Sequence, residues 1–314
     1  MTAARVADSP TSQRRTVVAK RVFLFLATNL AILVMVSIVL AVLGSLGYLD
    51  RAGGQGTLLI YCAVWGFGVS FASLLMSRWI AKRATGVQLI DGASGNADLD
   101  WLYNTVGNLT RQANLPMPEV GVYRSPEVNA FATGPSKKRS LVAVSTGLFE
   151  QMNRTEVEGV LAHEISHIAN GDMVTMTLIQ GVVNAFVFYL SHVVAGIVRN
   201  FLSGDRGRGG GGGLLVYYAV YFAAQILFGL IGSMITAWFS RGREFRADAG
   251  AAGLAGAGSM IAALRRLQAS TQRVDTQHRE LATLKIAGGR SLMQLLATHP
   301  PLEARIAALE GRGN

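Results

Sequence analysis

The chain has 314 residues and a formal net charge of +10; half of its residues are hydrophobic and only 15% are charged. Because charged residues make up about a quarter of a typical soluble domain, this composition argues against a chain that is soluble throughout and favours membrane segments joined to a soluble part. The basic residues flank apolar blocks and there is no nucleic-acid-binding motif, so the charge is interpreted as a topology signal and nucleic acid is not expected as a partner. The single cysteine, Cys62, excludes a disulfide framework and a cysteine-rich zinc site.

The N-terminal region predicts a basic tail followed by two membrane spans. Residues 1–21 are polar, with five basic residues and one acidic residue. The apolar run 22–44 is long enough to cross a bilayer core of about 30 Å and too long for the apolar region of a cleaved signal peptide. With the second apolar run, 58–80, it predicts a transmembrane hairpin over residues 22–80. Basic residues precede the first span and follow the second, which places both ends in the cytoplasm.

The region 81–172 predicts the first part of a cytoplasmic domain. Residues 96–114 carry apolar side chains at helical spacing. Three runs rich in β-forming residues follow, separated by turn signals, at 119–124, 128–133 and 140–145. We interpret them as a small antiparallel sheet that leads into a helix.

That helix carries an H-E-x-x-H pattern, with a start signal at Asn153 and a stop or kink at Gly171. Residues four apart share one face of an α-helix, so His163 and His167 can point their imidazoles at one metal ion. Glu164 lies beside that face, where a general base can reach a metal-bound water. The short pattern also arises by chance, and paired histidines can simply cap or pack, so a site needs a third ligand.

Two further apolar stretches, 173–198 and 214–239, predict a membrane-associated helical hairpin over residues 173–239. The glycine-rich segment 199–213 between them is interpreted as a flexible linker. The sequence leaves open whether these stretches cross the membrane or form a re-entrant hairpin. Residues 240–314 then form the second part of the cytoplasmic domain.

The hairpin supplies the missing ligand. Its first helix leaves just after His167 and its second returns just before Glu244, so the two side chains are expected to meet. Two histidines and one glutamate leave a fourth position for water, as in catalytic zinc sites. Asp248, one turn further on, is expected to accept a ring N–H from a ligand histidine. Asp172 fits the same role, although the sequence favours it as a cap at the start of the stretch 173–198. Glu244 with Asp248, taken alone, is better explained as a surface salt-bridge cluster.

The chain resembles the HtpX family of bacterial membrane zinc metalloproteases, which are relatives of the eukaryotic CAAX prenyl proteases. The likeness covers nearly the whole chain; the N-terminal tail and the glycine run depart from it. It rests on the paired N-terminal spans and on the motifs Asn129-Ala130-Phe131-Ala132-Thr133-Gly134, His163-Glu164-Ile165-Ser166-His167, Glu244 to Asp248, and Thr298-His299-Pro300-Pro301 with Arg305-Ile306. We therefore expect a mixed α+β, mainly helical fold, with about four transmembrane or membrane-embedded helices and a cytoplasmic zincin-type (gluzincin) domain carrying a small β-sheet.

The resemblance implies that His163, His167 and Glu244 bind one Zn²⁺ per chain and that Glu164 is the catalytic base. The expected protein is a zinc endopeptidase of the bacterial cytoplasmic membrane with its active site on the cytoplasmic side. Its expected substrates are misfolded or damaged membrane proteins and unfolded polypeptides, in quality control and the stress response. Its surroundings are the lipid bilayer.

Two further residues carry alternatives. His299, before a rigid Pro-Pro pair, is expected by resemblance to stabilise the oxyanion of the reaction; otherwise it is a capping or surface histidine. Asn129 begins a strand that is suited to binding a substrate backbone by strand addition, or that is an ordinary core strand. The rival to the enzyme as a whole is a non-catalytic membrane scaffold with a structural zinc site, which would need a fourth protein ligand such as His299. A transporter is less well supported, because the spans lack intramembrane charged residues.

Overall fold

The computed structural model describes residues 34, 37–47, 53–203, 212–277 and 295–311. The expected basic tail and most of the first predicted span fall outside these residues, as does most of the glycine-rich linker.

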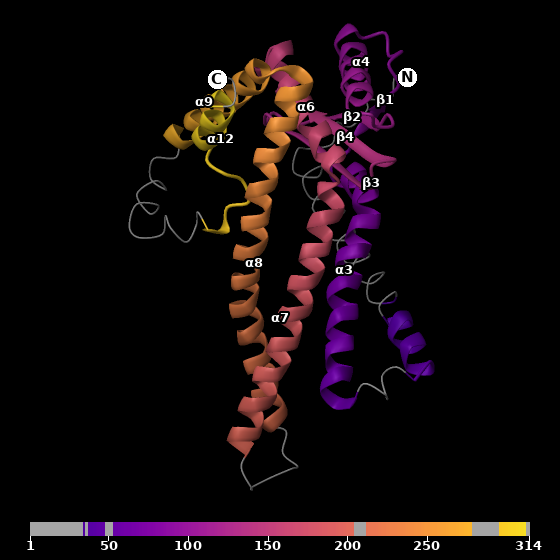
Figure 1. Ribbon diagram of the computed structural model, residues 1–314, viewed down its shortest axis with the longest axis vertical. Helices are drawn as coiled ribbons and strands as arrows, with labels where there is room; N and C mark the ends of the chain where they lie inside the picture. Colours follow the sequence, from indigo (N-terminus) through magenta and orange to yellow (C-terminus); the bar gives the residue numbers. More distant parts are fainter. Residues whose placement is uncertain (1–33, 35–36, 48–52, 204–211, 278–294, 312–314) are drawn as a thin grey trace, which may run out of the picture.

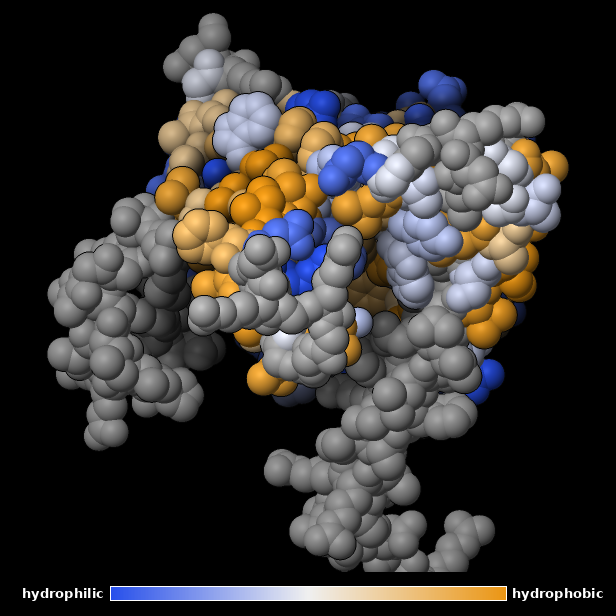
Figure 2. Space-filling model, turned by 90° about the horizontal axis from the view of Figure 1, so that it is seen from below, coloured by the Kyte–Doolittle hydropathy of each residue, from blue (hydrophilic) through white to orange (hydrophobic). Residues whose placement is uncertain are grey.

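Three long helices form the lower part of the molecule in Figure 1: α3 (Gly53–Thr85), α7 (Asp172–Ser203) and α8 (Gly212–Ala255). The middle helix, α7, packs against both of the others. Each of the three is long and apolar enough to cross a membrane. Only 6% of the apolar window of α8 is buried within the protein, so this helix needs a lipid environment to cover its apolar surface. Viewed along the helices from below, hydrophobic residues occupy large parts of the described surface (Figure 2).

The helix α8 is longer than expected. The sequence analysis treated the apolar stretch and the residues from 240 onward as separate elements, but one continuous helix carries both. No proline interrupts it, and it ends where Gly256 adopts the left-handed conformation, with φ of +85°. The next helix, α9 (Ala257–Gln277), starts directly afterwards. A single rigid helix therefore connects the apolar part of α8 to Glu244 and Asp248.

The sheet has four strands: β1 (Gln88–Ile90), β2 (Glu119–Tyr123), β3 (Ala130–Ser136) and β4 (Arg139–Ser145). Their spatial order is β1-β2-β4-β3, so β3 lies at an edge. The antiparallel sheet expected from the sequence is wrong in part, because β2 and β4 are parallel while the other two pairs are antiparallel. After β2 the chain crosses to the far side of β4 before it returns, and this crossover makes the sheet mixed.

The ends of β3 also differ from the prediction. Gly134-Pro135-Ser136 is the turn signal between the predicted runs 128–133 and 140–145, but β3 continues through these residues with an irregular register between Thr133 and Ser136. The turn itself lies at Lys137-Lys138. Gly134 has a φ of +147°, and a Cβ there would meet the Arg139 carbonyl oxygen at 2.2 Å, so only glycine fits this irregularity.

The helix α6 (Arg154–Asn170) runs through the centre of the soluble domain (Figure 1). It contacts β3, α8 and α9, and its residues Leu161 and Ile165 are completely buried. One hydrophobic core joins it to the sheet and to five further helices. Three of these have not yet been bounded: α4 (Ala97–Gln112), α5 (Thr146–Gln151) and α12 (Leu302–Glu310). The polar face of α6 is thereby fixed between the edge strand β3 and α8.

Candidate metal centre

Both ends of α6 are fixed by local hydrogen bonds. At its start, the Asn153 side chain accepts from the Glu156 amide at 3.0 Å and the Glu156 carboxylate accepts from the Asn153 amide at 2.9 Å, which is a capping box. At its end, Gly171 is left-handed with φ of +70° and donates its N–H to the His167 carbonyl. The sequence left a stop or a kink open at Gly171, and the structure shows a stop.

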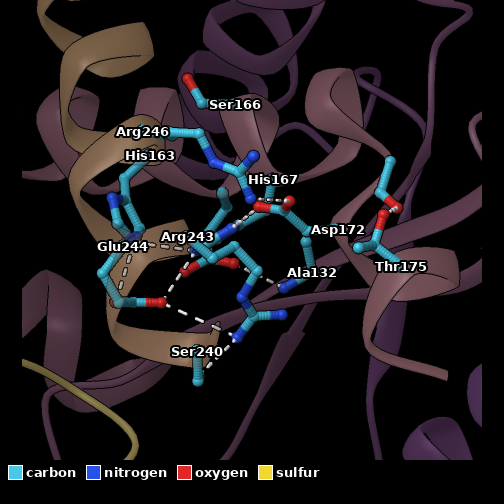
Figure 3. Close-up of polar contacts among 12 residues, drawn as sticks. Ala132, His163, Ser166, His167, Asp172, Thr175, Ser240, Arg243, Glu244 and Arg246 are labelled. Atoms are coloured by element: carbon cyan, nitrogen blue, oxygen red, sulfur yellow. Dashed lines mark hydrogen bonds and ion pairs between the residues drawn. The ribbon is translucent and has the colours of Figure 1, made fainter. Parts of the chain in front are cut away.

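Three side chains converge between α6 and α8 (Figure 3). The Nε2 atoms of His163 and His167 are 3.1 Å apart. From Glu244, Oε2 lies 3.6 Å from the first of these nitrogens and Oε1 lies 3.4 Å from the second. One ligand atom from each residue falls within 4.8 Å of the others. The three side chains are therefore placed to hold one metal ion.

The polar atoms at this point support a metal site. Oε1 of Glu244 is buried without a hydrogen-bond partner in the described part of the chain, although buried carboxylate oxygens are normally paired. A cation between this oxygen and the two imidazoles would satisfy it. Two imidazoles and one carboxylate form a donor set that fits a divalent transition metal such as zinc.

The Nδ1 atom of each histidine contacts a different aspartate carboxylate. Nδ1 of His163 lies 2.9 Å from Asp248, and Nδ1 of His167 lies 2.7 Å from Asp172. Both carboxylates are buried. The sequence interpretation favoured a cap for Asp172, but the structure places its carboxylate on the histidine instead. These contacts orient both rings so that the Nε2 atoms point at the same place.

The pKa values of the histidines reflect these carboxylates. Burial by itself would lower the pKa of His167, but the hydrogen bonds to Asp172 and Glu244 and the nearby charge of Glu164 raise it to about 9. The pKa of His163 is raised as well, since the carboxylates around it outweigh its burial. Without a metal, the His167 ring therefore favours the protonated form near neutral pH, and a bound cation would replace its Nε2 proton.

Arg305 contributes to the site in a way that the sequence analysis did not recognise. Its guanidinium bonds both oxygens of Asp248, at 2.7 and 2.6 Å, and its Nη1 lies 3.4 Å from Glu244. The residue is only 5% exposed, and its pKa is raised because these acidic partners outweigh its burial. The sequence signal was the Arg305-Ile306 pair within the family motif, to which no role was assigned. Arg305 links α12 to both acidic residues of α8.

Glu164 is held by the edge strand. Its Oε2 accepts a hydrogen bond of 2.7 Å from the backbone N–H of Ala132. The carbonyl of Asn129 faces β4, where it accepts from the Ser145 amide, and backbone groups alternate in direction along a strand. The polar groups of Ala130 and Ala132 therefore point to the open edge, which is the side that faces Glu164.

His299 and Asn129, for which the sequence left two roles open, also lie at this centre. Nδ1 of His299 is 2.8 Å from Oε2 of Glu244, while its side chain is 65% exposed. The backbone N–H of Asn129 donates to Ser145 Oγ at 3.1 Å. Both residues line a cavity of about 300 Å³ together with His163, Glu164 and Glu244. Five of the expected site residues thus line one cavity that is otherwise mostly apolar, and His167 and Asp248 lie behind it in contact with Glu244 and His163.

Comparison with known proteins identifies the class as membrane metalloprotease. The chain belongs to peptidase family M48, whose family model matches residues 96–313. It is 51% identical to "Protease HtpX" of Shewanella sp. (strain ANA-3) over 293 residues, which are 93% of this chain and 100% of that protein. It is 52% identical to "Protease HtpX" of Shewanella denitrificans (strain OS217) over 291 residues, 93% of this chain and 99% of that protein. The HtpX-like resemblance seen in the sequence is confirmed.

The fold is also similar to a solved structure. The crystal structure of S. mikatae Ste24p superposes with a TM-score of 0.65 at 19% sequence identity, covering 96% of this chain and 67% of that one. This likeness shows that the two chains share a fold. The expected mixed α+β, mainly helical fold is confirmed, with three candidate membrane helices among the described residues.

Proposed function

We propose that the protein is a zinc-dependent endopeptidase of the bacterial cytoplasmic membrane, with one Zn²⁺ per chain bound by His163, His167 and Glu244. The observation that carries this proposal is the convergence of these side chains around a buried Glu244 oxygen that has no hydrogen-bond partner among the described residues, beside the general base Glu164. When bound, zinc supplies a Lewis acid that polarises the scissile carbonyl and acidifies water. The three-ligand set, in a chain that belongs to a metalloprotease family, argues against the structural-zinc scaffold.

The residues around the metal position have distinct parts in the reaction. Glu164 takes the proton of the attacking water and passes it to the leaving amine. The Ala132 N–H keeps one of its carboxylate oxygens in place, so the other is directed at the reacting water. His299, at the mouth of the cavity, donates to the oxygen that becomes negative during attack.

The substrate is an extended polypeptide that pairs with the open edge of β3. The backbone groups of Ala130 and the carbonyl of Ala132 face this edge, while the Ala132 N–H is bonded to Glu164. Asn129 lies at the beginning of the edge, where it clamps the substrate backbone. The cavity next to Glu164 accepts one substrate side chain. Its walls are mainly apolar, with Leu148, Val160, Met260, Leu267 and Leu302. We therefore propose cleavage next to a large apolar residue, which is exposed in misfolded or damaged membrane proteins and in unfolded chains.

The active site is proposed to face the cytoplasm. Basic residues gather at the end of the long helices that is nearest the site, with Lys82 and Arg83 in the last turn of α3 and Arg241, Arg243 and Arg246 on α8. Cytoplasmic flanks of membrane helices are enriched in such residues. The arrangement favours the same orientation that the sequence predicted.

The proposal is tested by measuring zinc in purified variants and comparing cleavage sites. We expect Glu164→Gln to retain zinc, and His163→Ala or Glu244→Ala to lose it. Arg154→Ala, a change in an exposed ion pair at the opposite end of α6 from His167, is the control. Peptide products of the wild-type protein should share an apolar residue on one side of the cleaved bond. Zinc retained in both ligand variants would contradict the assigned ligands.

A further inference from the structure

A second cavity, of about 650 Å³, lies on α8 and shares no lining residue with the cavity at the metal centre. It begins where the apolar stretch of α8 ends and is closed on one side by the turn before α12. Its walls combine aromatic rings, cationic groups and a rigid proline pair. The residues that matter are Trp238, Arg241, Phe245, Arg246, Pro300 and Pro301.

The position of this groove corresponds to a membrane surface. The apolar window of α8 is almost entirely uncovered by protein, and Trp238, near its end, is 64% exposed. Tryptophan is enriched where a membrane helix meets the headgroups. The Arg241 and Arg246 side chains follow within the next two turns. A groove at this level meets lipid headgroups rather than acyl chains or bulk water.

The charges of the groove favour an anion. Both of its charged lining residues are arginines, and the described lining contains no acidic residue. Nη1 of Arg241 donates to the carbonyls of Leu295 and Ala297, at 3.1 and 2.9 Å, which fixes that guanidinium against the groove wall. The Arg246 side chain is 65% exposed, and its ion pair with Asp172 is long, at 3.8 Å. Guanidinium groups in this setting match the oxygens of a phosphodiester.

We propose that this groove binds the headgroup of an anionic phospholipid. Its phosphate lies between Arg241 and Arg246, and its glycerol end packs on Trp238 and Phe245. A zwitterionic headgroup brings a positive group next to the two guanidinium groups and is disfavoured. Because Pro300 follows His299, which contacts Glu244 at 2.8 Å, the bound lipid also touches the segment that enters the metal centre.

Photo-crosslinking tests this inference without relying on protease activity. The full chain is prepared with Glu164→Gln to prevent self-digestion, and with a photoreactive benzoylphenylalanine in place of Phe245. It is placed in nanodiscs of mixed phosphatidylcholine and phosphatidylglycerol, and the lipid adducts are identified by mass spectrometry. The same probe at Phe222, an exposed residue of the apolar part of α8, is the control.

At position 245, the ratio of phosphatidylglycerol to phosphatidylcholine adducts should exceed the ratio of the two lipids in the nanodisc. The expected excess is about fivefold for each guanidinium that contacts the phosphate. At position 222 they should follow the bulk composition. The excess should disappear in Arg241→Gln/Arg246→Gln and persist in Arg154→Gln/Arg265→Gln, two arginines with side chains 63% and 64% exposed elsewhere. If the double variant fails to fold, Arg246→Gln alone should lose about fivefold.

Two results would overturn the inference. One is an adduct ratio at position 245 that matches the bulk lipid, or adducts with polypeptide instead of lipid. The other is an excess that remains after the groove arginines are replaced in a folded protein.

Discussion

Replacing Arg305 with leucine should destabilise the protein strongly, because it leaves buried carboxylates without their cation. Arg305 is 5% exposed and Asp248 is 2% exposed, so water cannot solvate the charge that remains. Removing one partner of a buried ion pair costs about 3–5 kcal/mol. The substitution also removes the guanidinium that lies 3.4 Å from the Glu244 carboxylate. The loss in free energy of unfolding should therefore lie in the upper part of that range.

The assay is thermal unfolding of detergent-purified protein, with and without added zinc. The matched control is Arg265→Leu. Arg265, on α9, pairs with Glu310, which lies on α12 as Arg305 does, but both side chains of this pair are at least half exposed. An exposed pair of this kind contributes about 0–1 kcal/mol. Arg305→Leu combined with Asp248→Asn should recover part of the loss. Equal melting temperatures for the two leucine variants would refute the assignment of a buried, stabilising network.

Three further predictions concern the ligand supports, the ring protons and the helix packing. Asp172→Asn should weaken zinc binding by about 10–100-fold in a chelator competition, because the carboxylate no longer orients His167. In the metal-free protein, the raised pKa of His167 should contribute roughly 3 kcal/mol to the free energy of unfolding below pH 6.5. This contribution should be lost as the pH rises through about 9, which denaturation at a series of pH values would measure. Gly159→Ala should lower the free energy of unfolding by about 1–3 kcal/mol, because a Cβ there meets the Ser259 carbonyl oxygen at 2.5 Å. Gly253→Ala is the control: a Cβ there meets open space, so the change should be neutral or stabilising by up to about 1 kcal/mol.

Each of these has an outcome that contradicts it. Unchanged zinc affinity in Asp172→Asn would mean that His167 is oriented by other groups. A metal-free protein that becomes more stable between neutral pH and pH 9 would reverse the sign of the His167 contribution. Equal effects of the two glycine substitutions would show that α6 and α9 are not in close contact at Gly159.

The sequence was most informative where chemistry and spacing act together. His163 and His167 lie four residues apart on a capped helix, so their convergence follows from helix geometry alone. Glu244 is 77 positions further along the chain, yet the two apolar stretches between them predicted a hairpin that returns to the same place. Hydropathy thus located a contact that local periodicity cannot reveal.

The missed features depend on tertiary structure. β1 has three residues, two of them exposed, so it has no alternating pattern to detect. The parallel pairing of β2 with β4 depends on a crossover whose path is set by packing. The family motif marks the position of Arg305, but nothing in it separates a buried partner of Asp248 from a surface arginine. The same is true of the Ala132 amide, since every residue except proline has one.

The central claim is that Glu164 and a bound metal ion together make this protein a protease. The most direct measurement compares cleavage of an unfolded polypeptide by wild type and Glu164→Gln, both purified with chelator and then supplied with zinc. Zinc-dependent cleavage by the wild type, with none by a variant that binds equal zinc, is the predicted result. Cleavage of equal rate by Glu164→Gln, or by the wild type in the presence of excess chelator, would contradict the account.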